Sequence, residues 1–151
     1  MTTVLVLYHS QEYGNTKLMA EAIAQGAEDS GAAVTLINTN EERLELDRYR
    51  GFDAVAFGSP DYFSYVAGGL KTFLDDWYIA RKASPDGLSG KPLGLFFSHG
   101  GGGKAREPLE SLCGTLGTQI GETIESLGTP GANVLEECKA LGAKLAEAAV
   151  S

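Results

Sequence analysis

The chain has 151 residues, of which 43% are hydrophobic and 21% charged, a balance typical of one folded domain and not of a disordered chain. Twenty acidic residues against twelve basic ones give a formal net charge of -8, and no basic stripe interrupts this acidity. Such a charge repels a nucleic-acid backbone, so it argues against nucleic-acid binding.

The two cysteines, Cys113 and Cys138, are far apart and form no Cys-x-x-Cys pair. Both fall at apolar positions of expected helices, which favours buried free thiols over a metal or redox site. The apolar run at residues 4–8 follows no basic segment and is too short for a signal peptide or a membrane span. We therefore expect a cytoplasmic protein with no metal site and no membrane association.

Expected strands and helices alternate along the chain. Uninterrupted apolar runs predict buried strands, and apolar residues spaced three and four apart predict helices. The expected strands are residues 4–8, 33–37, 52–57 and 93–97, with a weak edge strand within 119–127. The expected helices are residues 17–30, 70–77, 109–116 and 132–149, with a short charged helix or loop over 41–50.

This alternation predicts right-handed crossovers and a parallel sheet covered by helices on both faces. With four or five strands the natural order is 2-1-3-4-5, which makes the first, third and fourth strands neighbours. Ligands of such sheets bind at the carboxyl ends of these strands. Residues 82–90 contain Pro, Ser and Gly and indicate a surface loop, so residues 1–151 are expected to form a single domain.

The first expected strand ends in residues 9–16, HSQEYGNT, which lead into a helix. The first N–H groups of a helix have no partner inside it, and the helix dipole places partial positive charge there. Ser10, Asn15 and Thr16 add short side-chain donors around Gly14. This stretch predicts an anion site, which we interpret as the site of a phosphate belonging to a larger flat ligand.

The loops after the third and fourth expected strands differ in chemistry from the first. One carries Tyr62, Phe63 and Tyr65 beside Pro60, an aromatic wall on which a planar ring could stack. The other has four glycines, residues 100–103, which let backbone N–H groups approach the polar edge of a ring. Each loop alone could be a tight turn or ordinary packing. Together they describe a mononucleotide with a large planar ring, and flavin mononucleotide (FMN) fits best.

Motifs of other functions on a similar fold do not match the sequence at particular residues. Gly103-Lys104 does not end a P-loop, because Ala105 follows the lysine and Ser98 takes the place of the first glycine. The dinucleotide fingerprint Gly-x-Gly-x-x-Gly is absent after the first strand. A phospho-accepting receiver would need clustered acids after the first strand and an aspartate after the third. Here residues 9–10 are His and Ser, and residues 58–59 are Gly and Ser. Ser98 and His99 are adjacent on a strand, so they point apart and make a poor nucleophile and base.

Three segments carry a resemblance to a known family: LVLYHSQEYGNT, FGSPDYFSYVAGGLKTFLD and PLGLFFSHGGGGK. At these residues the chain resembles the flavodoxin family. The second and third segments are more similar to flavodoxin-like NAD(P)H:quinone oxidoreductases and FMN reductases than to short electron-carrier flavodoxins. The resemblance spans nearly the whole chain and implies an α/β, flavodoxin-like three-layer αβα sandwich with a five-stranded parallel sheet of order 2-1-3-4-5.

The resemblance also implies a set of FMN contacts from the three loops, with the phosphate on the first loop and the ring between the other two. The implied FMN-binding residues are Ser10, Gln11, Tyr13, Gly14, Asn15, Thr16, Ser59, Pro60, Asp61, Tyr62, Phe63, Ser64, Tyr65, Ser98, His99, Gly100, Gly101, Gly102 and Gly103. His99, beside the ring, is the candidate catalytic residue, because an imidazole could stabilise negative charge or carry a proton.

The expected function is electron transfer through bound FMN, by an oxidoreductase that takes electrons from NAD(P)H or a reduced protein and passes them to a quinone or other acceptor. Two alternatives stay open. One is a flavodoxin that carries electrons between protein partners and has no small-molecule substrate. The other is a flavin-free interaction module on the same fold. The expected partners are a redox protein or a quinone-like acceptor, and a homo-oligomer is possible.

Overall fold

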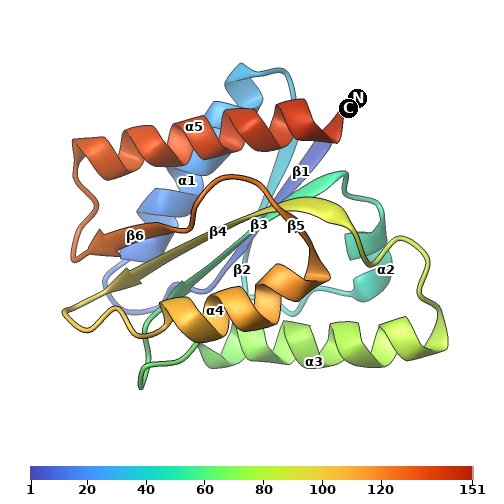
Figure 1. Cartoon of the computed structure of the whole chain (residues 1–151), viewed down its shortest axis with the longest axis horizontal. Coiled ribbons are helices and arrows are strands. Elements are labelled where there is room, and N and C mark those ends of the chain that lie inside the picture. The colour runs from blue at the N-terminus through green and yellow to red at the C-terminus, as the bar shows by residue number, and fades with distance from the viewer. Residues whose placement is uncertain (151) are drawn as a thin grey trace.

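A parallel β-sheet lies between two layers of helices (Figure 1). The computed structural model describes residues 1–150. The strands are β1 (Thr3–Tyr8), β2 (Ala33–Asn38), β3 (Ala54–Pro60), β4 (Lys91–His99), β5 (Gly117–Gln119) and β6 (Ile124–Leu127). The helices are α1 (Asn15–Asp29), α2 (Leu46–Arg50), α3 (Gly68–Ala83), α4 (Arg106–Cys113) and α5 (Ala132–Ala149), with a 3-10 turn at Gly114–Leu116. The strand order β2-β1-β3-β4-β5 confirms the predicted order 2-1-3-4-5.

The sequence predicts one weak edge strand within residues 119–127, and β6 lies within that segment, but the structure adds a second short strand, β5, just before it. β5 pairs with the first part of β4, and β6 pairs with the last part of the same strand. Between them the backbone turns at Gly121, whose φ of 72° lies in the left-handed region. β6 is therefore a sixth strand, and it ends at the same edge of the sheet as β1, β3 and β4.

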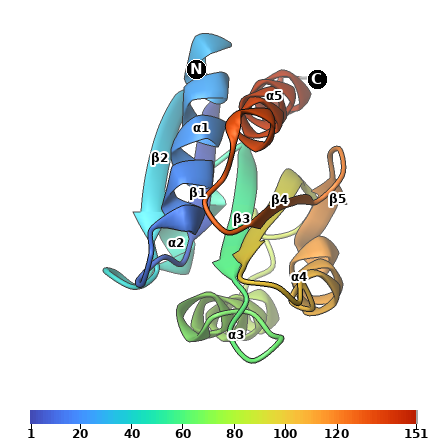
Figure 2. The same ribbon diagram turned by 90° about the vertical axis from the view of Figure 1, so that its left-hand side faces the viewer.

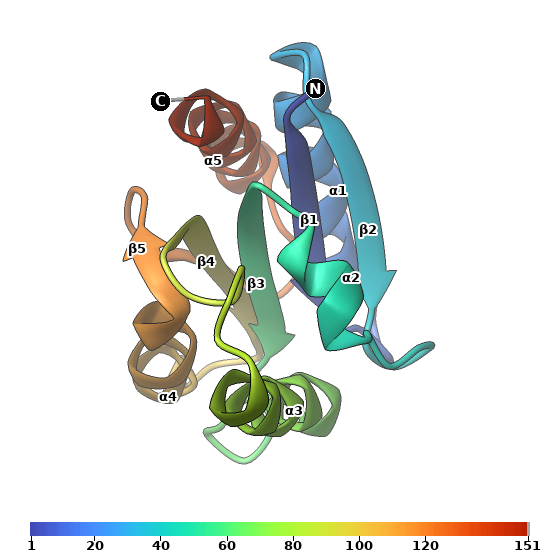
Figure 3. The same ribbon diagram turned by 90° about the vertical axis from the view of Figure 1, so that its right-hand side faces the viewer.

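Two apolar cores fill the space between the sheet and its helices. Along β1, Leu5 and Leu7 point to one face and pack in the core with α3 and α4, whereas Val4 and Val6 point to the other face, toward α1 and α5. Figures 2 and 3 show these helix pairs on opposite sides of the sheet. Because both faces of the strand are buried, its sequence is an uninterrupted apolar run and not an alternating one.

Helices α1 and α5 pack backbone against backbone. A Cβ atom added at Gly142 would overlap the backbone carbonyl of Ile23, and one added at Gly26 would overlap that of Lys139. The two glycines thus allow an approach that no larger residue permits. This contact sets the position of α1 over the sheet, and with it the place where the helix begins.

Both cysteines are buried free thiols, as predicted. Burial raises the pKa of Cys138 to about 12 and also raises the pKa of Cys113. Neither thiol therefore ionises near neutral pH, which disfavours thiolate chemistry. Within residues 1–150 no helix combines the length and the apolar character needed to cross a bilayer.

Replacing Gly142 with alanine should destabilise the fold. The added methyl group meets rigid backbone instead of a flexible side chain, and we expect the free energy of unfolding to fall by about 2 kcal/mol or more. Urea denaturation measures this change. The control is Gly68→Ala, at the start of α3, where an added Cβ meets nothing within 4 Å. Equal unfolding free energies for the two variants would contradict the close contact.

Candidate functional site

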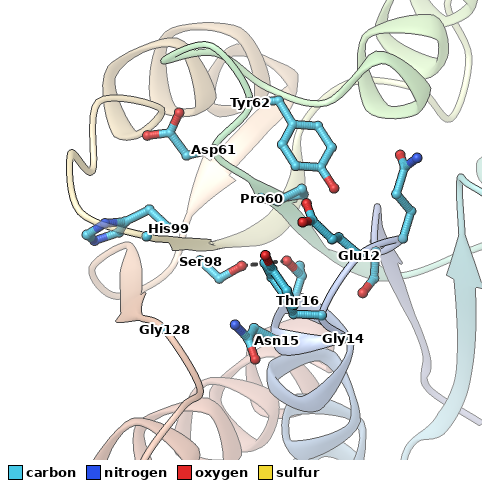
Figure 4. Close-up of a pocket in the computed structure, with 14 residues that line it drawn as sticks. Glu12, Gly14, Asn15, Thr16, Pro60, Asp61, Tyr62, Ser98, His99 and Gly128 are labelled. Carbon is cyan, nitrogen blue, oxygen red and sulfur yellow. Dashed lines mark hydrogen bonds between the residues drawn. The ribbon is translucent and has the colours of Figure 1, made fainter.

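A cleft of about 280 Å³ opens where β1, β3 and β4 end, at the edge predicted from the sequence. Its size is near the lower end of typical ligand pockets, which span roughly 300–1,000 Å³. Figure 4 shows the loops after these strands and the start of α1 converging on it. The lining residues are Ser10, Gln11, Glu12, Tyr13, Gly14, Asn15, Thr16, Pro60, Asp61, Tyr62, Ser98, His99, Gly100 and Gly128.

The N-terminus of α1 opens into this cleft. Gly14 has a φ of 76°, a left-handed conformation, and provides the N-cap position without a side chain to cap the helix. The first helical hydrogen bond runs from the N–H of Leu18 to the carbonyl of Gly14, so the N–H groups of residues 15–17 lie before the hydrogen-bonded ladder. The first turn contains no acidic residue. These donors and the positive end of the helix dipole therefore favour an anion here.

The first loop is held from behind by the end of β2. Oδ1 of Asn38 accepts the N–H of Ser10 at 3.0 Å, and Nδ2 of Asn38 donates to the carbonyl of Ser10 at 2.8 Å. His9 lies between Gln11 and Thr39, with its ring nitrogens 2.6 Å from Oε1 of Gln11 and 2.9 Å from Oγ1 of Thr39. Ser10 lines the cleft, and its backbone N–H and carbonyl are already paired with Asn38.

A hydrogen bond joins the first loop to the third across the floor of the cleft. The hydroxyl oxygens of Thr16 and Ser98 are 2.8 Å apart, and both residues are buried (Figure 4). Either hydroxyl can donate, and the one that accepts keeps its own hydrogen free for another partner. The pair therefore fixes the start of α1 against the tip of β4 and leaves one hydroxyl donor for a ligand.

The second loop brings one of its three predicted aromatic residues to the cleft. Tyr62 and Tyr65 close a two-residue turn through reciprocal backbone hydrogen bonds of 3.1 Å. The turn residues Phe63 and Ser64 have left-handed φ values of 56° and 60°, and the side chain of Phe63 is fully exposed. Tyr62 faces the cleft and contacts the ring of His9 edge-on. Phe63 and Tyr65 do not line the cleft.

Asp61 connects the second loop to the third. Its N–H donates to the carbonyl of Ser98 at 2.9 Å, and its carboxylate accepts the N–H of Ala105 at 3.2 Å. Ser59 lies behind the cleft, where its buried hydroxyl accepts the N–H of Ala67 at 2.9 Å. Ser59 therefore stabilises the turn from inside, whereas Asp61 both lines the cleft and holds its walls together.

The third loop contributes its first residues to the cleft and folds the rest away. Ser98, His99 and Gly100 line the cleft. The N–H of Gly101 donates to Nδ1 of His99 at 3.1 Å, so this donor is used inside the loop. The other ring nitrogen, Nε2, lies 2.6 Å from Oε2 of Glu125 on β6. Of the four predicted glycines, only Gly100 therefore lines the cleft.

The structure brings most of the predicted site residues to one cleft, but not all of them. The predicted residues outside its lining are Ser59, Phe63, Ser64, Tyr65, Gly101, Gly102 and Gly103. Glu12 and Gly128 line the cleft without having been predicted. Gly128 follows β6, has a φ of 69° and donates its N–H to the carbonyl of His99 at 2.8 Å. Recognising β6 as a strand would have placed the glycine that follows it at this edge.

The cleft lining contains no lysine or arginine, and its two charged side chains, Glu12 and Asp61, are acidic. Burial, followed by the negative charge of Glu12, raises the pKa of Tyr62, so its phenol stays protonated at neutral pH. An anion in the cleft would therefore be held by backbone N–H groups, hydroxyls and the dipole of α1.

Replacing Asn38 with alanine should loosen the first loop. The N–H and the carbonyl of Ser10 would lose their partners, and we expect the free energy of unfolding to fall by about 2 kcal/mol. Amide hydrogen exchange should also become faster over residues 10–16. Asn40→Ala, at an exposed neighbouring position, is the control and should change neither quantity appreciably. Unchanged exchange in the Asn38 variant would show that another contact holds the loop.

The strand order and the three-loop cleft define a flavodoxin-like α/β protein. A family model described as NADPH-dependent FMN reductase matches residues 45–126, more than half of the chain. The chain therefore belongs to the NADPH-dependent FMN reductase family.

Solved structures and a curated protein are also similar to this chain. A flavodoxin from the domain Archaea superposes with a TM-score of 0.85 at 29% identity, covering 99% of this chain and 100% of the flavodoxin. A WrbA-like flavodoxin protein from Agrobacterium tumefaciens has a TM-score of 0.75 at 25% identity, covering 99% and 98% of the two chains. A diflavin flavoprotein of Thermosynechococcus vestitus is 30% identical over 149 residues, 97% of this chain. The chain spans only 25% of that relative's length.

Proposed function

We propose that the cleft binds FMN and that the protein transfers electrons through it, as an NAD(P)H-dependent oxidoreductase acting on a quinone or another small acceptor. The observation that carries this proposal is the uncapped start of α1, which opens into a cleft built from three strand-end loops. Membership of the NADPH-dependent FMN reductase family supports it. When bound, FMN would supply the redox chemistry, and the protein would bind, orient and tune it.

The proposed phosphate contacts come from backbone and hydroxyl groups. The N–H groups of residues 15–17 precede the helical ladder, and the hydroxyls of Ser10 and of the Thr16–Ser98 pair lie beside them. Helix N-termini bind phosphate in this way through the dipole and the free N–H groups. This donor set fits a phosphate without a lysine or arginine side chain in the lining.

The proposed ring contacts come from the two walls of the cleft. Residues 60–62 form one wall, with Tyr62 as its aromatic surface, and residues 98–100 form the other. Both ring nitrogens of His99 are engaged, one by the N–H of Gly101 and one by Glu125. In this conformation His99 would therefore orient its loop and shape the local charge, and it would not act as a free proton carrier.

A carrier flavodoxin without a small-molecule substrate is the second candidate function. The archaeal flavodoxin, which this chain covers over its full length, favours it. In that case the electron donor and acceptor would both be proteins, and the exposed rim of the cleft would be the place of contact.

Absorbance of the purified protein and anaerobic addition of NADPH test these proposals. We expect flavin absorbance, a thermal unfolding midpoint that rises with added FMN by mass action, and rapid bleaching of the flavin by NADPH. Flavin that binds but does not react with NADPH, while accepting electrons from a protein donor, would favour the carrier. A colourless protein that excess FMN does not stabilise would overturn both.

An added negative charge at the start of α1 should separate ligand binding from stability. Asn15→Asp places a carboxylate where the phosphate is proposed to lie, and we expect the dissociation constant for FMN to rise roughly tenfold or more, by repulsion between like charges. The free energy of unfolding should stay the same or rise, because an acid stabilises a helix N-terminus. Equilibrium titration of FMN and urea denaturation measure the two effects.

Asn133→Asp is the matched control for this charge. Asn133 is exposed in the first turn of α5 and does not line the cleft, so the same substitution adds the same charge at another helix start. Equal loss of FMN affinity in both variants would mean that net charge, and not the start of α1, governs binding.

A further inference from the structure

Glu125, on β6, lies outside the cleft lining. It joins His99 of the third loop to Arg106 of α4. One carboxylate oxygen, Oε2, is 2.6 Å from Nε2 of His99, and the other, Oε1, accepts from Nη2 of Arg106 at 2.8 Å. The His99 ring and the Arg106 guanidinium both lie against Phe97, with His99 stacked at 25° and Arg106 5.4 Å from the ring centroid. Glu125 therefore closes a compact cluster at the end of β4.

The hydrogen bonds determine which nitrogen of His99 carries the proton. The N–H of Gly101 can only donate, so Nδ1, which it reaches at 3.1 Å, must present its lone pair. The carboxylate of Glu125 can only accept, so Nε2 must carry the hydrogen. Both neighbours thus select the same neutral tautomer. The hydrogen bonds from Arg106 and His99 also lower the pKa of the Glu125 carboxyl, which keeps it ionised.

The glycine loop folds over this pair of side chains. Gly103 has a φ of 66°, and a Cβ atom added there would lie 3.1 Å from Oε2 of Glu125 and 3.3 Å from Nε2 of His99. The loop therefore meets the His99 ring at two points, the N–H of Gly101 and the backbone of Gly103. A change in the orientation or protonation of the ring would disturb both.

We propose that Glu125 is a positioning residue that fixes the proton on Nε2 of His99 and thereby holds residues 99–103 in the conformation that shapes the cleft. Glu125 reaches the cleft through His99, which lines it, since Glu125 does not line the cleft itself. This arrangement keeps the N–H of Gly101 turned inward and leaves Gly100 at the cleft wall. The consequence for FMN affinity rests on the proposed function, whereas the consequences for the tautomer and the loop do not.

Glu125→Ala tests the proposal through the ring nitrogens themselves. Nitrogen-15 NMR of the wild-type imidazole should show a protonated Nε2 and an unprotonated Nδ1 of His99. In Glu125→Ala we expect a mixture of tautomers, amide exchange at Gly101 that is about tenfold faster, as for the loss of one hydrogen bond, and weaker FMN binding. A single unchanged tautomer together with unchanged Gly101 exchange would overturn the proposal.

Two further variants separate the tautomer from charge and folding. Glu125→Gln keeps a carbonyl oxygen for the Nε2 hydrogen but removes the negative charge that pairs with Arg106, so the tautomer and the Gly101 exchange should stay as in wild type. If this variant behaves like Glu125→Ala, the ion pair with Arg106 and not the tautomer holds the loop, and the proposal fails. Glu122→Ala removes an exposed acid from the same β5–β6 segment and should alter neither readout.

The outcome for FMN is distinguishable from the outcome for the loop. If wild-type protein shows the expected tautomer and protected Gly101 amide but binds no FMN, the proposed function fails and the positioning role of Glu125 stands. If FMN binds equally well to wild type and Glu125→Ala while the NMR readouts change, the proposed effect of the loop on the cleft is contradicted.

Discussion

The start of α1 is the feature on which the site depends. A helix N-terminus attracts an anion only if its N–H groups are left without a cap and are held where a ligand can reach them. Gly14 meets the first condition, because it turns the chain through a left-handed conformation and offers no capping side chain. The close contact of α1 with α5 and the paired backbone of Ser10 meet the second, because they fix both the helix and the loop before it.

The three loops are linked to one another as well as to the sheet. Thr16 bonds to Ser98, and Asp61 bonds to the backbone of Ser98 and Ala105. Hydrogen bonds within the protein therefore position the walls of the cleft, and no ligand is needed to bring them together. Such pre-ordering lowers the entropy lost when a ligand binds. It also explains why several groups predicted to face a ligand are instead occupied by the protein.

The cleft has no positively charged side chain in its lining, and this determines its electrostatics. The chain is acidic, and the cleft lining itself carries acids and no basic side chain. Dipoles and hydroxyls must therefore provide the attraction for a phosphate, while Glu12 and Asp61 place negative charge beside any bound ring. The ionised Glu125 adds a further negative charge behind His99, balanced by Arg106. The potential of a bound flavin would reflect the balance of these terms.

The sequence by itself determined the sheet order, the edge of the sheet where the site lies and most of the residues of the first loop. These followed from apolar periodicity and from Gly14, Asn15 and Thr16 at a strand-to-helix junction, which are local properties of the chain. Only the tertiary structure decided that β6 exists as a separate strand, that Phe63 turns outward and that the N–H of Gly101 serves His99. Each of these depends on partners distant in sequence or on the conformation of a turn. Residue type and spacing do not encode such contacts, because the same glycine or aromatic residue serves equally well in a wall, a turn or a core.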